Sequence, residues 1–211
     1  MTSAAPPPAG STRIVLVRHG EPDHAVRGRC HGRLDVALSA RGYEQMRRAR
    51  RLLRHTPLSV IYSSPSRRAR ESADVLADRR HPVRLDDRLR EIDFGELEGL
   101  AYDDIARRFP GTYREWMDRP TDVVFPGGER FAAMASRVRG ALDHIRQAHE
   151  GETVAVVSHG GVNRIAVAAA LELPPRRIFR LDQAYAGVNV IDYLGDEPFV
   201  RVVNAVAGRR C

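Results

Sequence analysis

Three short apolar runs, each followed at once by polar residues, constrain the fold of this chain more than any other feature. They cover residues 14–17 (IVLV), 59–62 (SVIY) and 153–157 (TVAVV). Their apolar residues are nearly continuous rather than alternating, which is typical of strands buried on both faces. Segments with helical spacing lie between them. This alternation predicts an α/β fold: a three-layer α/β/α sandwich with a mostly parallel central sheet and a small inserted lid.

The helical segments and the remaining strands follow from local signals. Ser39 is a plausible N-cap for a helix that runs to about His55. Apolar residues at helical spacing predict further helices over about 129–148, 65–78 and 161–171, the last of them stopped by Pro174 and Pro175. Residues 186–194 and 199–203 are predicted to form strands, as an antiparallel pair.

The domain organisation predicted from the sequence is simple. Residues 1–12 begin MTSAAPPPAGS, which lacks the basic and apolar regions of a signal peptide and indicates a disordered tail. Residues 13–208 are predicted to form one domain, because 211 residues suffice for about one. The stretch 95–127 has short helical pieces, several Pro and Gly, and the only tryptophan, and we expect it to be an inserted lid that sets substrate specificity.

Lysine is absent, so all 34 basic residues are arginine. This excludes the lysine-dependent phosphate chemistries of P-loop proteins and kinases, and the Schiff-base chemistry of aldolases and pyridoxal-phosphate enzymes. What remains is abundant guanidinium, which is always charged and suited to bidentate binding of phosphate or carboxylate.

The net charge of +7 and pI near 10.2 raise the alternative of nucleic-acid binding. The arginines are scattered, interleaved with acids and lack an aromatic stacking pattern, so we predict no nucleic-acid partner. Two distant cysteines, Cys30 and Cys211, form neither a disulfide framework nor a metal spacing. A cytoplasmic location and no metal are therefore expected. No apolar run approaches the roughly 18 residues of a membrane span, so no membrane partner is expected.

Polar clusters come directly after each of the three apolar runs. They read Arg18-His19-Gly20-Glu21, Ser63-Ser64-Pro65-Ser66-Arg67-Arg68 and Ser158-His159-Gly160-Gly161. In open α/β sheets, ligands bind beyond the carboxyl ends of the strands. We therefore expect two histidines and several arginines to meet at one edge of the sheet.

Phosphomonoesters need the chemistry that these clusters offer. Such an ester carries about −1.5 to −2 charges at pH 7 and needs fixed positive donors and an in-line nucleophile. A histidine nitrogen can be that nucleophile and form a covalent phospho-enzyme. A glycine after each histidine lets a backbone N–H approach the phosphate, and a helix beginning at Gly160 would add its dipole.

The order of these motifs resembles the histidine phosphatase superfamily, whose fold is phosphoglycerate-mutase-like. The resemblance covers about residues 13–208 and is closest to small bacterial phosphatases of the α-ribazole phosphatase and broad-specificity groups. It is carried by 16–21 (LVRHGE), 32–39 with Gly42 and Gln45, Ser63-Ser64 with Arg68-Ala69 and Ser72-Ala73, 89–91 with 94–99, 126–129 (PGGE), and 157–161 (VSHGG).

This resemblance implies a role for each motif residue. His19 would be the phosphoryl-accepting nucleophile, and Arg18 and Arg68, with Gly160, would bind the phosphate. His159 would stabilise the group in transfer. Glu91 would protonate the leaving alkoxide and then activate water, a task that suits a carboxyl with a raised pKa.

The chain departs from the family pattern at one position. Many members carry Asn where this sequence has Ala25, and we expect that contact to be missing or replaced by His24 or Arg29. Trp116 is a candidate for the substrate pocket and equally a candidate for the core.

The resemblance implies a metal-independent phosphomonoesterase without a cofactor, acting on a small phosphorylated metabolite as monomer or homodimer. Two alternatives stay open: phosphoryl transfer of the phosphoglycerate-mutase type, and a non-catalytic domain that binds a phospho-ligand. The stretch before the PGGE motif is short, with Arg114 and Arg119 well separated, which argues against a mutase. An intact Glu91 argues against a mere binder.

Overall fold

A six-stranded sheet in the order β3-β2-β4-β1-β5-β6 forms the centre of the computed structural model, which describes residue 8 and residues 10–208. The strands are β1 (Thr12–Arg18), β2 (Leu58–Ser63), β3 (Val83–Leu85), β4 (Thr153–Ser158), β5 (Val188–Leu194) and β6 (Glu197–Ala205). The first four are parallel, and β5 and β6 run antiparallel at one edge. Strand β3, which the sequence analysis missed, is only three residues long and largely exposed.

The register of the central strands brings their carboxyl ends together. Arg18 of β1 lies opposite Ser158 of β4, and Val157 of β4 lies opposite Ser63 of β2. The polar clusters that come after these three strands therefore start side by side. This arrangement confirms the prediction drawn from the three apolar runs.

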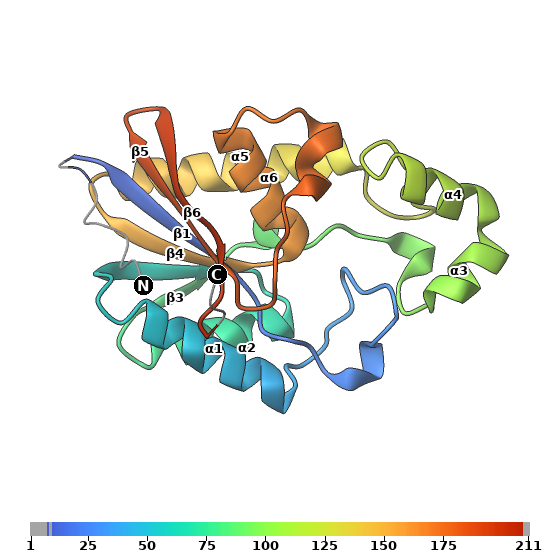
Figure 1. Cartoon of the computed structure of the whole chain (residues 1–211), viewed down its shortest axis with the longest axis horizontal. Coiled ribbons are helices and arrows are strands. Elements are labelled where there is room, and N and C mark those ends of the chain that lie inside the picture. The colour runs from blue at the N-terminus through green and yellow to red at the C-terminus, as the bar shows by residue number, and fades with distance from the viewer. Residues whose placement is uncertain (1–7, 9, 209–211) are drawn as a thin grey trace.

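Helices cover both faces of the sheet, as predicted. Helices α1 (Ala40–Leu52) and α2 (Arg67–Ala77) lie on one face, and α5 (Phe131–Ala148) and α6 (Gly160–Ala170) on the other (Figure 1). The buried side chains of β1 alternate between two cores: Val15 and Val17 pack with α1 and α2, while Ile14 and Leu16 pack with α5 and α6. The near-continuous apolar runs are thus explained by burial on both faces.

Helix starts place functional residues at the edge of the sheet. The Ser39 hydroxyl caps α1 by accepting the N–H of Gly42 at 3.0 Å, as predicted. Helix α2 begins at Arg67, so Arg68 lies in its first turn. Helix α6 begins at Gly160, directly after His159. Short 3₁₀ helices complete the connections: His24–Val26, Asp87–Leu89, Gly95–Leu97 and Pro175–Arg180.

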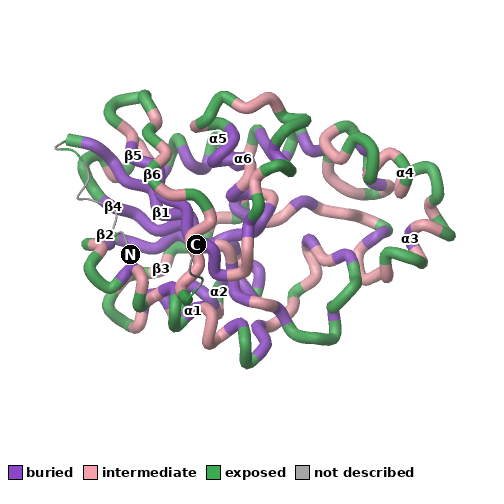
Figure 2. The backbone as a smooth tube through the Cα atoms, viewed as in Figure 1, coloured by how far each residue is buried: buried purple, intermediate pink, exposed green. Residues whose placement is uncertain are grey.

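The segment 95–127 contains α3 (Tyr102–Arg108) and α4 (Pro110–Asp118), which lie beyond the carboxyl ends of the strands (Figure 1). Helix α4 has no buried residue, and the tube is mostly pink and green there (Figure 2). Trp116 packs against Phe94 and Phe125 with ring centroids 5.1 and 5.2 Å apart. The tryptophan therefore belongs to an aromatic cluster with Phe94 and Phe125, and its part in a substrate pocket stays a prediction.

The beginning of the chain differs from the predicted tail over 1–12. Thr12 opens β1, and Ser11 is buried and bonded to the carbonyl of Pro8, so the folded part begins earlier than predicted. Residues 1–7 and 9 of that tail lie outside the described residues.

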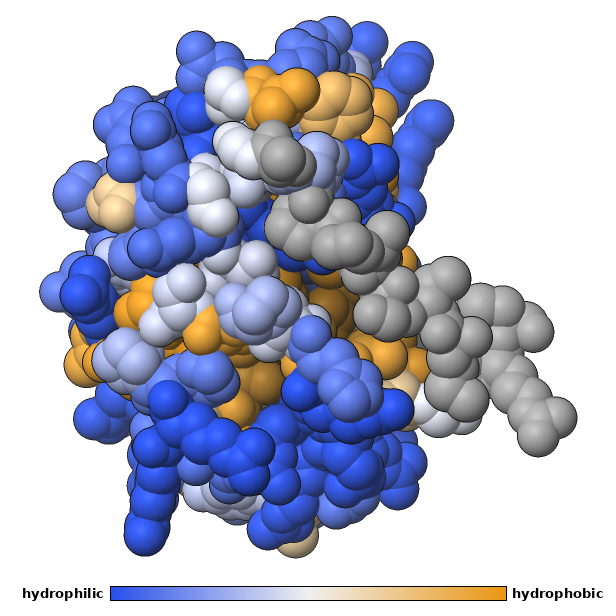
Figure 3. Space-filling model, turned by 90° about the vertical axis from the view of Figure 1, so that its left-hand side faces the viewer, coloured by the Kyte–Doolittle hydropathy of each residue, from blue (hydrophilic) through white to orange (hydrophobic). Residues whose placement is uncertain are grey.

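Seen from the end opposite α3 and α4, apolar side chains gather in a middle band between hydrophilic outer faces (Figure 3). None of the helices described is both long and apolar enough to span a bilayer.

Candidate active site

His19 lies directly after β1 and is only 3% exposed. Its Nδ1 is 2.7 Å from the carbonyl oxygen of Gly20. Because a carbonyl can only accept, Nδ1 carries the proton and Nε2 of the neutral ring keeps its lone pair. The atom that the local geometry leaves available as a nucleophile is therefore Nε2.

The surroundings of His19 favour its neutral form. Burial lowers its pKa well below the ordinary 6.5, and the charges of Arg68 and Arg18 lower it further, which outweighs the raising effect of the bond to Gly20. A neutral imidazole is the nucleophilic form, so the ring is ready to react at neutral pH without a separate base.

Arg68 is fully buried, and its guanidinium is fixed at all three nitrogens. Its Nε donates to Nε2 of His19 at 3.3 Å, while its outer nitrogens donate to the carbonyls of Leu34 and Gly32 at 2.8 and 2.6 Å. None of these partners is charged, so the positive charge of Arg68 stays available beside the nucleophile. Burial lowers the pKa of Arg68, but a guanidinium stays protonated even so.

Glu98 fixes the loop that holds Arg68. Its carboxylate accepts backbone N–H groups of Gly32 at 3.0 Å, Arg33 at 2.8 Å and Phe94 at 3.1 Å. The carbonyls of this same loop orient Arg68. Glu98 thus acts on the site through Arg68, a role that the sequence analysis did not assign, although it noted Glu98 within the family motif.

His159 comes directly after β4 and faces His19, with ring centroids 5.2 Å apart. Its Nε2 is 2.8 Å from the hydroxyl of Ser64, the residue after β2. Its Nδ1 is buried and has no hydrogen-bond partner within the described chain. Burial, then the charge of Arg68, lowers the pKa of His159 well below 6.5. When Nε2 accepts the Ser64 hydroxyl, the neutral ring carries its proton on Nδ1, which is then a donor that a phosphoryl oxygen can occupy.

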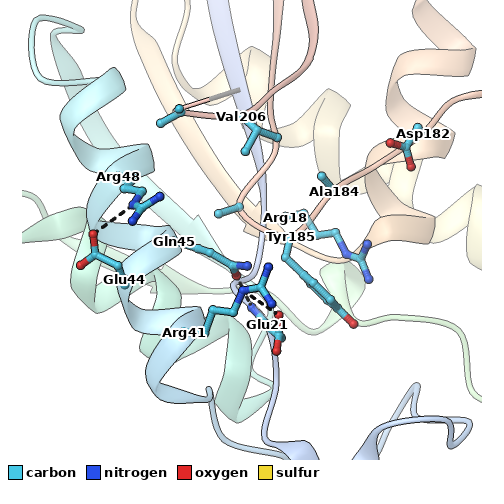
Figure 4. A pocket seen from close by; sticks show the side chains of 13 residues that line it. Arg18, Glu21, Arg41, Glu44, Gln45, Arg48, Asp182, Ala184, Tyr185 and Val206 are labelled. Atoms are coloured by element: carbon cyan, nitrogen blue, oxygen red, sulfur yellow. Dashed lines mark hydrogen bonds and ion pairs between the residues drawn. The ribbon is translucent and has the colours of Figure 1, made fainter. Parts of the chain in front are cut away.

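Arg18, the last residue of β1, points its guanidinium along the aromatic ring of Tyr185, 4.1 Å from the ring centroid (Figure 4). One outer nitrogen donates to the carbonyl of Gln183 at 2.5 Å. Its Nε is buried without a partner in the part of the chain that the structure covers. Arg18 therefore offers a second unneutralised cation near His19.

Tyr185 is a site residue that the sequence analysis missed. Its ring lies 5.6 Å from that of His19, between two cavities. One, of about 530 Å³, lies along Arg18 and α1 (Figure 4). The other, of about 180 Å³, is lined by residues 21–31 of the loop after β1. No periodicity or motif marks a lone tyrosine before a C-terminal strand, so no local signal could have found it.

Glu91 meets the N-terminus of α6 beside the two histidines. One carboxylate oxygen accepts the N–H of Gly161 at 3.0 Å, and the other accepts that of Ile92 at 3.0 Å. A Cβ on Gly161 would lie 2.3 Å from the Glu91 carboxylate. The close approach of helix and carboxylate therefore requires glycine at this position.

Of the remaining predicted residues, Gly160 lies next to Arg18, whereas His24 and Arg29 lie on the exposed surface. Gly160 lies in the first turn of α6, next to Arg18. His24 and Arg29, the predicted replacements at the Ala25 position, are both exposed: His24 lies 3.9 Å from Glu21, and Arg29 donates to the carbonyl of Gly99. His31, in the same loop, is partly buried. Burial lowers its pKa, and the charges of Arg68 and Arg18 lower it further.

Metal-ligating side chains do not gather in the described residues: no three of His, Cys, Asp and Glu come together in a way that could hold an ion. The polar groups around the His19 ring are instead the guanidiniums of Arg68 and Arg18 and the imidazole of His159. Such a set suits an anion with several oxygens.

Histidines and arginines that meet at the carboxyl edge of such a sheet are typical of a class of phosphoryl-transfer proteins, and comparisons with known proteins agree. The family model described as histidine phosphatase superfamily (branch 1) matches residues 14–206. The chain belongs to this superfamily.

Several relatives are named as phosphatases, and one that is 38% identical over 155 residues is a phosphoglycerate mutase-like protein of Arabidopsis thaliana. Phosphoserine phosphatase 1 of Hydrogenobacter thermophilus is 38% identical over 148 residues, which is 70% of each chain. A crystal structure of a putative alpha-ribazole-5'-P phosphatase from Escherichia coli matches with a TM-score of 0.85 and 27% identity over 94% of this chain and 99% of that one. Mycobacterial glucosyl-3-phosphoglycerate phosphatase matches with a TM-score of 0.82 and 31% identity over 92% and 99%.

Proposed function

We propose that this protein is a phosphomonoesterase that works through a phosphohistidine at Nε2 of His19 and needs no metal ion. The observation that carries the proposal is the arrangement around this atom. Nε2 has a lone pair fixed by the bond from Nδ1 to Gly20, and Arg68 lies beside it. The unpartnered Nδ1 of His159 and Nε of Arg18 lie close by.

In the first step, Nε2 attacks phosphorus and the bond from phosphorus to the ester oxygen breaks. Glu91, in its protonated form, gives its proton to the departing alkoxide, so that an alcohol leaves. Arg68, Arg18 and His159 surround the three phosphoryl oxygens and stabilise the charge in the transition state. The N–H groups at the start of α6 add to this field.

In the second step, water attacks the phosphorus of the phosphohistidine. Glu91, now a carboxylate, takes a proton from the water as the bond from nitrogen to phosphorus breaks. Inorganic phosphate leaves, and His19 and Glu91 return to their starting forms. Glu91 is well placed for both proton transfers, since it lies at the α6 N-terminus that borders the phosphate position.

The substrate is a small phosphorylated metabolite that enters past the segment 95–127. The two cavities that Tyr185 borders, of about 530 and 180 Å³, have the size of a small molecule rather than of a macromolecule. Phosphoserine and α-ribazole phosphate, which the names of relatives point to, are the first candidates. A cytoplasmic location belongs to the same proposal.

Substitution of the nucleophile tests the mechanism. His19→Ala should abolish turnover of p-nitrophenyl phosphate and the acid-labile labelling of the protein by a radioactive phosphomonoester. His55→Ala is the matched control, because that exposed histidine lines neither of the cavities beside Tyr185. A His19 variant that keeps the wild-type rate would show that another group is the nucleophile.

Chelation tests the absence of a metal ion from the mechanism. EDTA should leave the rate of p-nitrophenyl phosphate hydrolysis unchanged, and loss of activity restored by a divalent ion would contradict the metal-free mechanism.

An enzyme of the phosphoglycerate-mutase type would make a different product from a phosphatase. Incubation with 3-phosphoglycerate and its bisphosphate should release inorganic phosphate rather than 2-phosphoglycerate. Efficient isomerisation would replace the phosphatase proposal by a mutase.

A further inference from the structure

Arg164 is a third arginine at this edge of the sheet, and the mechanism above does not use it. It lies one turn into α6, on the same face as Gly160, and is only partly exposed. Its Nε donates to the carbonyl of Leu181 at 2.9 Å, and its guanidinium carbon lies 5.6 Å from the ring centroid of Phe179. These contacts fix the stem of the side chain and leave the two outer nitrogens for another partner.

Arg164 and Arg18 form a pair of cations about Gly160. A Cβ at Gly160 would lie 3.0 Å from an outer nitrogen of Arg164 and 3.5 Å from the guanidinium carbon of Arg18. Both guanidiniums are tied to carbonyls of one short segment, Leu181 and Gln183. Among the described residues, neither of them forms an ion pair with a carboxylate.

The charges near Arg164 indicate what it can bind. Burial, then the charge of Arg18, lowers its pKa, while Glu91 and Asp182 act in the opposite sense. The two carboxylates are close enough to affect the pKa of Arg164 but do not contact its guanidinium. Arg164 therefore has two carboxylates in its surroundings, and neither of them pairs with its outer nitrogens.

We propose that Arg164 binds a carboxylate carried by the leaving group of the substrate, so that the enzyme is selective for phosphate esters of hydroxy acids. This inference rests on the proposed phosphatase function. The transferring phosphoryl group takes Arg18, Arg68 and His159. Glu91, which faces the ester oxygen, and Arg164 lie on neighbouring positions of the same helix terminus, Gly161 and Gly160. A leaving group that reaches Glu91 thus comes close to the outer nitrogens of Arg164.

A carboxylate fits this position better than a second phosphate. It is planar, and a guanidinium with its Nε already occupied can still offer two outer nitrogens to it. It brings one negative charge rather than nearly two, which matches a cation that already has Glu91 and Asp182 nearby.

Two substrates that differ mainly in one group give the test: 3-phosphoglycerate carries a carboxylate where glycerol 3-phosphate carries a hydroxymethyl group. Wild-type kcat/KM should be about 10- to 100-fold higher for 3-phosphoglycerate, the range expected for hydrogen bonds to a charged group. Arg164→Gln should remove this preference, mainly through KM, and leave p-nitrophenyl phosphate within about two-fold. Arg164→Lys should keep part of the preference. Arg177→Gln, an exposed arginine of the 3₁₀ helix at 175–180, is the matched control.

Each outcome decides the proposal. Equal wild-type rates for the two esters would overturn it, and so would equal losses of all substrates in Arg164→Gln with an unchanged melting temperature. A stronger dependence on Arg164 for propane-1,3-diol bisphosphate than for 3-phosphoglycerate would also overturn it, in favour of a second phosphate. Failure of the wild type to hydrolyse p-nitrophenyl phosphate would instead contradict the phosphatase function itself.

Discussion

Two sets of arginines, one on the outer face of α1 and one at the carboxyl edge of the sheet, have different partners. On α1, Arg47, Arg48 and Arg51 all lie within 3.8 Å of the Glu44 carboxylate. At the sheet edge, Arg18 and Arg68 donate to backbone carbonyls instead. The guanidiniums on α1 therefore share a carboxylate, whereas those at the sheet edge have only uncharged partners.

This difference shows how a charge is held ready for a ligand. A carboxylate partner cancels the charge of a guanidinium, and in solvent such a pair contributes little to stability. A carbonyl partner fixes the geometry but leaves the positive charge uncompensated, and burial strengthens its action on a bound anion. The location of the hydrogen-bond acceptors, rather than the number of arginines, separates the site from the surface.

Replacing one arginine in each region by the uncharged Gln should give the largest difference in kcat/KM between two variants. Arg68→Gln should lower kcat/KM for p-nitrophenyl phosphate about 10²- to 10³-fold, because it removes a preorganised donor to the transferring oxygens. Arg47→Gln, on α1, should stay within about two-fold, because Arg47 pairs with Glu44 and lines neither cavity beside Tyr185. Steady-state kinetics with both purified variants would check this, and comparable losses in the two would show that charge acts from a distance rather than through fixed geometry.

Gly161→Ala should break the contact between α6 and Glu91, since its Cβ would lie 2.3 Å from the carboxylate. We expect kcat/KM for an alkyl phosphate to fall about 100-fold, in the range for loss of a general acid. The fall should be smaller for p-nitrophenyl phosphate, whose leaving group needs little protonation. Equal losses for both esters would indicate that Glu91 does not protonate the leaving group. Gly140→Ala is the control, because nothing lies within 4 Å of its Cβ position.

Glu98→Gln should reduce kcat/KM about 10-fold if Glu98 acts through the loop that orients Arg68. Residues that act through one another are not additive. In an Arg68→Lys background the same substitution should therefore cost almost nothing further. A full additional loss in the double variant would show that Glu98 supports the site by another path.

The buried histidines should make the folded protein sensitive to mild acid. His19 and His159 have pKa values well below 6.5 in the folded state and near 6.5 when unfolded. Below pH 6.5 the unfolded chain binds more protons, so stability is complete above this pH and falls as the pH drops towards the folded pKa values. Each histidine should contribute a slope of up to about 1.4 kcal/mol per pH unit.

Urea unfolding at pH 7.5 and pH 5.5 would measure this slope, with His159→Asn as the comparison. The variant should lose less stability than the wild type between the two pH values. An identical loss in both proteins would mean that His159 is not a neutral buried group in the folded state.

The elements that were predictable from the sequence were those with a strong local pattern. The apolar runs gave β1, β2 and β4, and helical spacing gave α1, α2, α5 and α6 within a few residues. Their residues are buried on one or two faces, so hydrophobic pattern and structure coincide. Strand β3 was not predicted, because its three residues are mostly exposed and carry no hydrophobic pattern.

Site residues were predictable where they come directly after a strand or belong to an ordered motif. Arg164 had a usable signal, because it stands four residues after Gly160 in a predicted helix and must share its face. Tyr185 and His31 had none, since they reach the site through loops and a distant connection. His24 and Arg29, the proposed replacements for the missing Asn, are both exposed, and their part in phosphate binding stays a prediction.

The sequence alone determined the class of fold, the edge of the sheet where chemistry occurs, and the histidine and arginine types found there, because these depend on local periodicity and on the residues directly after each strand. Only the tertiary structure decided which nitrogen of His19 carries the proton, which carbonyls hold Arg18 and Arg68, and how Glu98 and Arg164 join the site. Those properties arise from contacts between segments far apart in the chain, such as the carbonyl of Gly32 with Arg68 and that of Gln183 with Arg18, and no local pattern encodes them.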